Sequence, residues 1–292
     1  MVIEEKDLQR IRVISRGTYG VVYLGKYMEN DVAIKVFKKR NRRINMENFL
    51  KEVEILRGLR HKNVVLYMGV CIGQSSYMII TEYMDRGSLY NILHEKNVRL
   101  PVERILDIII EVAQAMVYLH KKQIVHCDLK SSNILVDHNW NIKLADFGLS
   151  RIRTRSSRLL TYEEKAKQKL RIGTPHWMAP EILRGEKYEE SSDVYSFGLV
   201  VLELLTGQIP NKELSIPQIT GLVGFNSDYR QEIPEDLPHE FFRFLIEKCT
   251  RRDPRERPSF QQILVETKRH RDHMAFPQLN TDTPNRQRNL SH

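Results

Sequence analysis

Four polar residues stand at fixed offsets in two short segments of the chain. Asp128, Lys130 and Asn133 lie in HCDLKSSN (126–133), and Asp146 follows Asn133 by thirteen residues in LADFG. Phosphoryl transfer needs these residue types: a carboxylate to receive or orient the acceptor hydroxyl proton, oxygen ligands for Mg²⁺, and a cation for the transferred group. The spacing suits a short hairpin that returns its two ends to one site, and it disfavours four unrelated surface groups.

Two earlier segments could complete such a site. In VAIK (32–35), Lys35 follows apolar residues on a predicted strand. Its ammonium could extend to the surface, or it could pair with Glu52 on the following helix and be held toward phosphate oxygens. The turn SRGTYGVV contains Gly17 and Gly20, which would let the backbone approach a phosphate closely, although glycines also occur in ordinary hairpin turns.

The elements that must position these residues change in character along the chain. Alternating apolar residues in the first third predict five antiparallel strands, IRVISRG, GVVYLGKY, DVAIKVF, VVLYMGV and SYMIITEY. One helix, ENFLKEVEILRGLRH, interrupts them, and the apolar periodicity of residues 102–120 predicts a long second helix. A hairpin, NILVDHNWNIKLADFG, and further helices follow.

The predicted fold class is therefore α+β, with a small antiparallel β lobe that holds one main helix and a larger, mainly α-helical lobe. We expect the first lobe over residues 8–84 and the second over residues 85–268. Residues 269–292 end in a polar, aperiodic stretch that is typical of disorder, and we expect them to form a tail.

Composition is that of an ordinary globular protein: 292 residues, 34.5 kDa, 41% hydrophobic and 28% charged. The N-terminal MVIEEKDLQR lacks the apolar core of a signal peptide, and the most apolar runs are short and carry Asp107 and Glu203. We therefore expect no membrane segment. Cys71, Cys127 and Cys249 are far apart and fit no zinc spacing, which indicates a reduced, cytoplasmic protein.

The net charge of +9 is unevenly placed, because residues 151–171 hold eight Lys or Arg against two Glu, and residues 38–43 read KKRNRR. Such runs are common on solvated surfaces, but they can also bind nucleic acid or acidic lipid. A nucleic-acid site would interleave the cations with stacking aromatics, and residues 151–171 contain only Tyr162. We expect no nucleic-acid partner.

Taken in order, the series G-x-x-G-x-V, VAIK, a helix Glu, H-x-D-x-K-x-x-N, DFG and APE resembles the catalytic domain of eukaryotic protein kinases, over about residues 8–268. Ser15 departs from the family, whose glycine-rich turn has a glycine at that place. Asp193 matches the helix aspartate that braces the catalytic loop in the family. Arg257 matches the arginine that pairs with the APE glutamate, here Glu181.

Within the family, DLKSSNILV and GTPHWMAPE resemble the tyrosine-kinase-like group, near Raf and mixed-lineage kinases. Lys130 and Thr174 are choices of the serine/threonine type. The resemblance implies transfer of the γ-phosphate of ATP to serine or threonine hydroxyls of protein substrates, in signalling. A dual-specificity or tyrosine kinase and a catalytically weak pseudokinase scaffold remain as alternatives.

The resemblance also implies roles for individual residues. The catalytic set would be Lys35, Glu52, Asp128, Lys130, Asn133 and Thr174. The residues that would contact ATP, through the phosphate-facing turn, the walls around adenine and the backbone at its edge, are Ile14, Ser15, Gly17, Gly20, Val22, Ala33, Lys35, Thr81, Glu82, Met84, Leu135 and Asp146. Asn133 and Asp146 would bind Mg²⁺ or Mn²⁺. His126 and Phe147, with Leu56, would belong to the stack that links the two lobes.

Cys127 directly precedes Asp128, and its type invites a chemical role. A nucleophile is not expected, because phosphoryl transfer needs no covalent intermediate and an ordinary thiol, with a pKa of about 8.5, is mostly protonated near neutrality. Most kinases have arginine here, and that arginine binds a phosphate on the activation segment. We therefore expect that phosphorylation at Thr154, Ser156, Ser157 or Thr161 is not strictly required, with Arg151, Arg155 or residues 38–43 as alternative phosphate partners.

Overall fold

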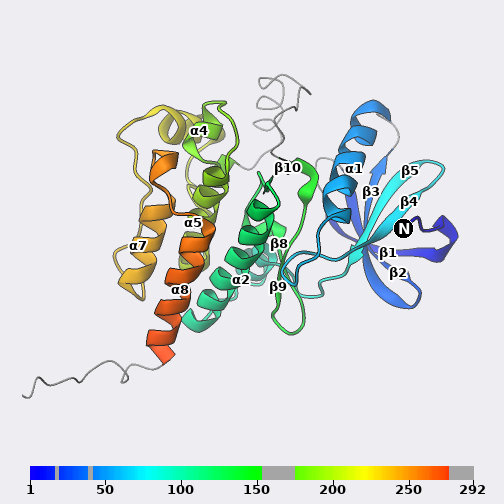
Figure 1. The fold of residues 1–292 in the computed structure, drawn as a ribbon, viewed down its shortest axis with the longest axis horizontal. Helices are drawn as coiled ribbons and strands as arrows, with labels where there is room; N and C mark the ends of the chain where they lie inside the picture. The colour runs from blue at the N-terminus through cyan, green and yellow to red at the C-terminus, as the bar shows by residue number, and fades with distance from the viewer. Residues whose placement is uncertain (17–19, 39–41, 153–174, 276–292) are drawn as a thin grey trace, which may run out of the picture.

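The computed structural model describes residues 1–16, 20–38, 42–152 and 175–275. They form two lobes, one built on an antiparallel sheet and one mainly of helices, as Figure 1 shows on its right and left sides. The predicted α+β, two-lobed fold is confirmed. Among these residues no helix is both long enough and apolar enough to span a bilayer.

The first lobe contains a five-stranded antiparallel sheet in the order β1-β2-β3-β5-β4. The strands are β1 (Leu8–Arg16), β2 (Val21–Tyr27), β3 (Asn30–Lys38), β4 (Tyr67–Ile72) and β5 (Ser76–Glu82). Helix α1 (Arg42–Arg57) packs on one face of this sheet. The N-terminal Val2 adds a parallel bridge to Val70 on β4.

Strand β3 shows how alternation directs side chains. Val32, Ile34 and Val36 are buried in a cluster on one face of the sheet. Phe37 points to the opposite face, where it contacts Phe49 of α1 edge to face at 5.9 Å between ring centroids. Lys35 shares the face of Phe37 because it differs from it by two residues, so its side chain is directed toward α1.

The second lobe is built around α5 (Glu190–Thr206), most of whose residues are buried. Around it lie α2 (Val102–Lys121), α4 (Pro180–Leu183), α6 (Ile216–Ile219), α7 (Glu240–Cys249) and α8 (Phe260–Ala275). Short helical turns connect them: η3 (Asn91–Glu95), η4 (Ser131–Asn133), η5 (Phe147–Leu149), η6 (Pro175–Trp177), η7 (Thr220–Phe225) and η8 (Pro254–Glu256).

Two small sheets lie where the lobes meet. β6 (Gly87–Ser88), β8 (Ile134–Val136) and β9 (Ile142–Leu144) form one of them. β7 (Ile124–Val125) pairs with β10 (Arg151–Ile152) in the other. The pairing of β8 with β9 is the hairpin predicted from the sequence.

The boundary of the expected tail at residue 269 is wrong, because α8 continues to Ala275. Packing explains the extension: the His270 ring stacks on Phe241 of α7 at 4.2 Å and 9°. Arg271 also reaches Asp107 of α2 at 3.4 Å. The part of the tail from 276 onward lies outside the described residues.

Candidate active site

Lys35, Glu52 and Asp146 converge from three elements. The Lys35 Nζ donates to both carboxylate oxygens of Glu52 at 2.8 Å and to Asp146 Oδ1 at 2.8 Å. Glu52 is almost fully buried on α1, whereas the Asp146 side chain is 47% exposed. The pairing of Lys35 with Glu52, one of two outcomes considered from the sequence, is therefore present. The Asp146 carboxylate, in contrast, remains partly exposed to solvent.

The electrostatics of this triad follow from burial and opposite charge. Burial alone would lower the pKa of Lys35, but the carboxylates of Asp146 and Glu52 raise it above its ordinary value. Burial raises the pKa of Glu52, and Lys35 opposes that shift. Burial would also raise the pKa of Asp146, yet Lys35 holds it at about 2, so Asp146 is ionised near neutrality.

Asp146 is held in an unusual backbone conformation. Its φ of 60° and ψ of 75° lie in the left-handed region, which few non-glycine residues adopt. Its side chain accepts a hydrogen bond from the Gly148 backbone N at 3.4 Å as the cap of η5. This turn directs the carboxylate back toward Lys35 instead of continuing the strand.

Asp128, Lys130 and Asn133 form a second group in the loop before β8. Asn133 Nδ2 donates to Asp128 Oδ2 at 3.0 Å and to the Asp128 carbonyl at 2.8 Å. Lys130 Nζ lies 3.0 Å from the same Asp128 Oδ2. Because the amide nitrogen of Asn133 is used in both bonds, its Oδ1 is the side-chain oxygen suited to a cation.

The β8–β9 hairpin joins the two groups. Ile134 pairs with Leu144, and the Ala145 N–H donates to the Asn133 carbonyl at 2.9 Å. Asn133 and Asp146 therefore flank the open end of one hairpin, as the spacing predicted. The His126 and Phe147 rings also meet here, with centroids 5.3 Å apart.

Asp193 on α5 supports the loop from below. Its two oxygens accept from the backbone N–H groups of His126 and Cys127, both at 2.9 Å. His120 Nε2 lies 3.0 Å from Asp193 Oδ2. The bracing contact expected for Asp193 is thus present, whereas sequence reasoning missed His120.

Cys127 is buried, and its Sγ donates to the Val125 carbonyl at 3.5 Å. Its φ of 65° is left-handed. A buried thiol is poorly placed as a nucleophile, and within the described parts of the chain no cluster of three or more His, Cys, Asp or Glu could hold a metal. Nearby, the Arg151 guanidinium lies 5.5 Å from the centroid of the Tyr188 ring. The four proposed phosphosites and Arg155 lie outside the described residues.

The residues expected to surround adenine come from both lobes. Ala33 pairs with Thr81 across β3 and β5, Ser15 pairs with Val22 across β1 and β2, and Leu135 lies on β8. The side chains of Ile14, Val22, Ala33, Thr81 and Leu135 are half-buried, unlike the fully buried Val32 and Ile34 on the other face of β3. This exposure is compatible with a ligand between the lobes.

Hydrogen bonds within the protein limit which backbone groups of Glu82 and Met84 could bind a nucleotide. The Glu82 N–H donates to the Leu66 carbonyl at 3.1 Å, so only the Glu82 carbonyl could contact a nucleotide. The Met84 carbonyl accepts from the Gly87 N–H at 3.1 Å, which makes the Met84 N–H the matching donor. The Glu82 side chain binds Lys143 at 2.7 and 2.9 Å.

Gly20 has a packing reason of its own. A Cβ at this position would lie 2.4 Å from the Val36 carbonyl oxygen, so β3 alone requires glycine here. Gly17 and Thr174, both expected at the site, lie outside the described residues.

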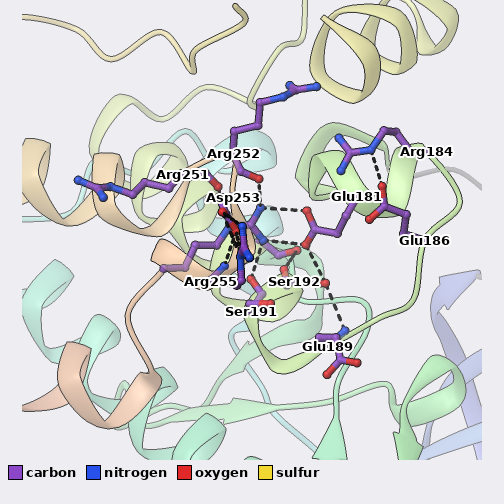
Figure 2. Close-up of polar contacts among 12 residues, drawn as sticks. Glu181, Arg184, Glu186, Glu189, Ser191, Ser192, Arg251, Arg252, Asp253 and Arg255 are labelled. Carbon is purple, nitrogen blue, oxygen red and sulfur yellow. Dashed lines mark hydrogen bonds and ion pairs between the residues drawn. The ribbon is translucent and has the colours of Figure 1, made fainter. Parts of the chain in front are cut away.

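A buried ion pair between Glu181 of α4 and Arg257 holds the segment that follows the catalytic residues. Arg257 forms two hydrogen bonds to Glu181, at 2.7 and 2.9 Å, as the resemblance to the kinase family implied. Figure 2 shows the polar contacts around Glu181, which include the Ser192 hydroxyl at 2.9 Å. Arg257 also donates to the carbonyls of Arg251, Ser191 and Arg252. Four acceptor groups around one guanidinium make this a rigid anchor.

Sequence reasoning missed one more group, at Glu203 on α5. This fully buried carboxylate accepts from Ser131 Oγ, His94 Nε2 and Trp177 Nε1. A single acid in the apolar run FGLVVLELL was the available signal, because a charge buried in a core helix requires partners.

Comparison with known proteins agrees with this geometry. A family model described as "Protein tyrosine and serine/threonine kinase" matches residues 8–267. The chain is 41% identical over 263 residues to the serine/threonine-protein kinase CTR1 of Arabidopsis thaliana, covering 88% of this chain and 31% of that protein. It is 37% identical over 266 residues to STY17, a serine/threonine-protein kinase of the same plant, covering 90% and 44%.

A third relative is drkA of Dictyostelium discoideum, named a probable serine/threonine-protein kinase, at 37% identity over 264 residues. The alignment covers 88% of this chain and 39% of that protein. The chain thus spans less than half the length of these relatives.

Proposed function

The chain belongs to the protein tyrosine and serine/threonine kinase family, and from that premise we propose that it transfers the γ-phosphate of ATP to serine and threonine hydroxyls of proteins. The observation that carries the proposal is the joining of two charged groups, Lys35–Glu52–Asp146 and Asp128–Lys130–Asn133, by one hairpin. This arrangement supplies a phosphate-binding cation, two possible metal ligands and a carboxylate for the acceptor.

The donor set fits a hard divalent cation. Asp146 is ionised and partly exposed, and Asn133 has an amide oxygen beside it on the hairpin. Magnesium prefers one or two protein oxygens and completes its shell with phosphates and water, so fewer than three acidic residues suffice. When bound, Mg²⁺ would neutralise charge on the phosphates of ATP. Mn²⁺ would fit the same oxygens.

Each residue then has a defined task. Glu52 holds the Lys35 ammonium in place, and this cation would contact the phosphates of ATP. Asp128 would orient the acceptor hydroxyl and take its proton. Lys130, 3.0 Å from Asp128, would balance the charge that develops on the transferred group. Adenine would be enclosed by the half-buried side chains of Ile14, Val22, Ala33, Thr81 and Leu135.

The preference for serine and threonine rests on Lys130 and on the names of the relatives, which are serine/threonine-protein kinases. Incubation with Mg-ATP and a mixed Ser, Thr and Tyr peptide library, followed by identification of the phosphorylated residue, tests it. We expect phosphoserine and phosphothreonine. Phosphotyrosine as the dominant product would favour the dual-specificity or tyrosine alternative, and ATP binding without transfer would favour a pseudokinase.

The cellular setting is also a proposal. Cys71, Cys127 and Cys249 are all free and buried, which supports function in a reducing compartment such as the cytoplasm. Protein substrates and regulators are the partners that a kinase domain requires.

A further inference from the structure

A cavity of about 530 Å³ lies along one side of α2. It is lined by the loop that joins α1 to β4, one face of α2, the β8–β9 hairpin and α8. These elements are neighbours, since α2 contacts both β9 and α8 (Figure 1). None of the lining residues belongs to the sets assigned to ATP, metal or catalysis. The volume is typical of a site for a small ligand.

Asn63 gives this cavity a buried acceptor whose orientation is fixed. The residue is only 2% exposed, and its Nδ2 donates to Glu111 Oε2 at 2.7 Å and to the Ile142 carbonyl at 2.9 Å. Turning the amide over would place its oxygen against two other acceptors, so Oδ1 is the atom left over. Among the described residues this buried Oδ1 has no hydrogen-bond partner. A ligand donor would remove the cost of leaving it unpaired.

Helix α2 supplies two more acceptors. Gln114 Oε1 is also buried without a partner in the part of the chain that the structure describes. Glu111 precedes Gln114 by three residues and shares its face of the helix. The Glu111 Oε2 accepts from Asn63 and from the Ile142 N–H, whereas its Oε1 has no hydrogen bond within the described ranges.

The charge of Glu111 favours a cationic donor. Burial raises the pKa of its carboxyl, and a positive group beside it would oppose that shift. A guanidinium is planar, always charged, and carries five N–H donors in a fixed fork. Such a group can bind a carboxylate oxygen and two amide oxygens at the same time.

The lysines around the cavity suit an anion. Four cations are among the described lining residues, and two of them already have partners: Lys143 binds Glu82, and Arg271 pairs with an acid of α2. Lys62 and Lys268 are exposed and form no ion pair with any described residue. A carboxylate on the ligand would therefore find two free ammonium groups.

We propose that this cavity is a binding site for a zwitterionic ligand, whose guanidinium is held by Asn63, Glu111 and Gln114 and whose carboxylate is held by Lys62 and Lys268. Two sources carry this chemistry, the free amino acid arginine and an arginine next to an acidic residue in a protein segment. The inference goes beyond the proposed function, because none of these five residues would contact ATP or the acceptor hydroxyl.

Three small probes test the chemistry. L-Arginine carries both charges, agmatine lacks the carboxylate, and L-citrulline keeps the shape of arginine with an uncharged urea. Titration of each probe into ¹⁵N-labelled protein, followed by chemical shifts, gives the Kd. We expect L-citrulline to bind at least ten-fold more weakly than L-arginine, because charge-assisted hydrogen bonds are lost. Agmatine should bind several-fold more weakly, as loss of an exposed ion pair would predict.

Two substitutions, neither at a residue that holds β9, connect the binding to the cavity. Gln114→Met removes a buried acceptor and should weaken L-arginine and agmatine alike, by about ten-fold. Lys268→Ala should weaken L-arginine several-fold and leave agmatine unchanged. Gln261→Met and Arg269→Ala are the matched controls, since both residues are exposed on α8 outside the cavity lining, and they should keep the native Kd.

A capped Arg-Asp dipeptide distinguishes the two sources. Tighter binding of the dipeptide than of L-arginine assigns the site to a protein segment, and the reverse assigns it to the free amino acid; either result supports the site if it depends on Gln114. Three outcomes would overturn the proposal: no saturable binding of L-arginine or the dipeptide, equal affinity for L-citrulline, or a native Kd in Gln114→Met. Phosphotransfer is not part of the readout, so the result is independent of the proposed function.

Discussion

Two sets of acidic residues serve this molecule in different ways. At the junction of the lobes, Asp146 is about half exposed and pairs with Lys35, which it shares with Glu52. Around α5, the carboxylates of Glu181, Asp193 and Glu203 are almost completely buried and bind backbone N–H groups, hydroxyls, an indole, histidines and an arginine. The first set can exchange partners when a charged ligand arrives, and the second cannot.

The acidic residues at the junction of the lobes can take part in chemistry, whereas the buried ones around α5 hold the structure together. The contact of Lys35 with the half-exposed Asp146 costs less to break than a contact between fully buried groups, so the Asp146 carboxylate is available for a ligand. A buried carboxylate without its donors carries a large desolvation penalty, so those contacts persist. Substitutions in the first set should therefore change rates more than stability, and substitutions in the second should mainly change stability.

The largest effect is expected at Lys35. Lys35→Met removes the cation that would hold the phosphates, and Asp146→Asn removes a charged metal ligand. Each should lower the turnover of ATP onto a peptide by several orders of magnitude, since charge stabilisation of this kind is the main source of rate in phosphoryl transfer. Initial rates with Mg-ATP measure it.

Lys26→Met is the control, because Lys26 also forms an ion pair, with Asp31 at 3.0 Å, but on the surface. It should keep the native rate. Near-native activity in both Lys35→Met and Asp146→Asn would show that the assigned site is wrong.

The next largest effect is expected at the buried ion pair between Arg257 and Glu181. Arg257→Ala leaves the buried Glu181 carboxylate without its cation and should reduce the free energy of unfolding by roughly 3–5 kcal/mol. Arg255, two residues away, pairs with Asp253 on the surface with 89% of its side chain exposed. Arg255→Ala should leave the urea midpoint unchanged. Equal midpoints for the two variants would contradict the distinction between exposed and buried pairs.

A smaller effect is expected in the activation segment. Changing Thr154, Ser156, Ser157 and Thr161 together to Ala should leave the initial rate within a few-fold of the native protein, because Cys127 cannot bind a phosphate as arginine would. Phosphatase-treated and untreated native protein are the comparison. If both unphosphorylated forms lose about a hundred-fold, a loss of order 3 kcal/mol in the barrier, another cation has replaced the arginine.

The smallest expected effect is a pH dependence of the free energy of unfolding that arises from Asp146. Burial alone would raise its pKa, but Lys35 lowers it to about 2. An acid whose pKa is lower in the folded state than in the unfolded state stabilises the folded protein above its unfolded pKa of about 4. This stabilisation is lost as the pH falls toward about 2. The difference in free energy of unfolding between native protein and Asp146→Asn should thus be constant near neutrality and narrow below about pH 4. Urea unfolding at several pH values measures it, and a constant difference throughout would exclude the Lys35 contact as its cause.

Much of the site was predictable because its signals are local. Alternation along β3 places Lys35 on the same face as Phe37, and helical periodicity placed Glu52 on the inward side of α1. The offset of thirteen from Asn133 to Asp146 suits a hairpin, and β8 and β9 form it. The end of α8 was not predictable, because its last turns depend on the stacking of His270 on Phe241, which lies on another helix.

The amino-acid sequence by itself determined the fold class, the order of the lobes and the residues that could transfer a phosphate, since period and spacing are properties of the chain. Only the tertiary structure decided that Asp146 turns back to contact Lys35 and that Glu203 gathers Ser131, His94 and Trp177. These contacts join residues up to 111 positions apart. No local pattern specifies such partners, because they are selected by which buried polar groups the packed helices bring within hydrogen-bonding distance.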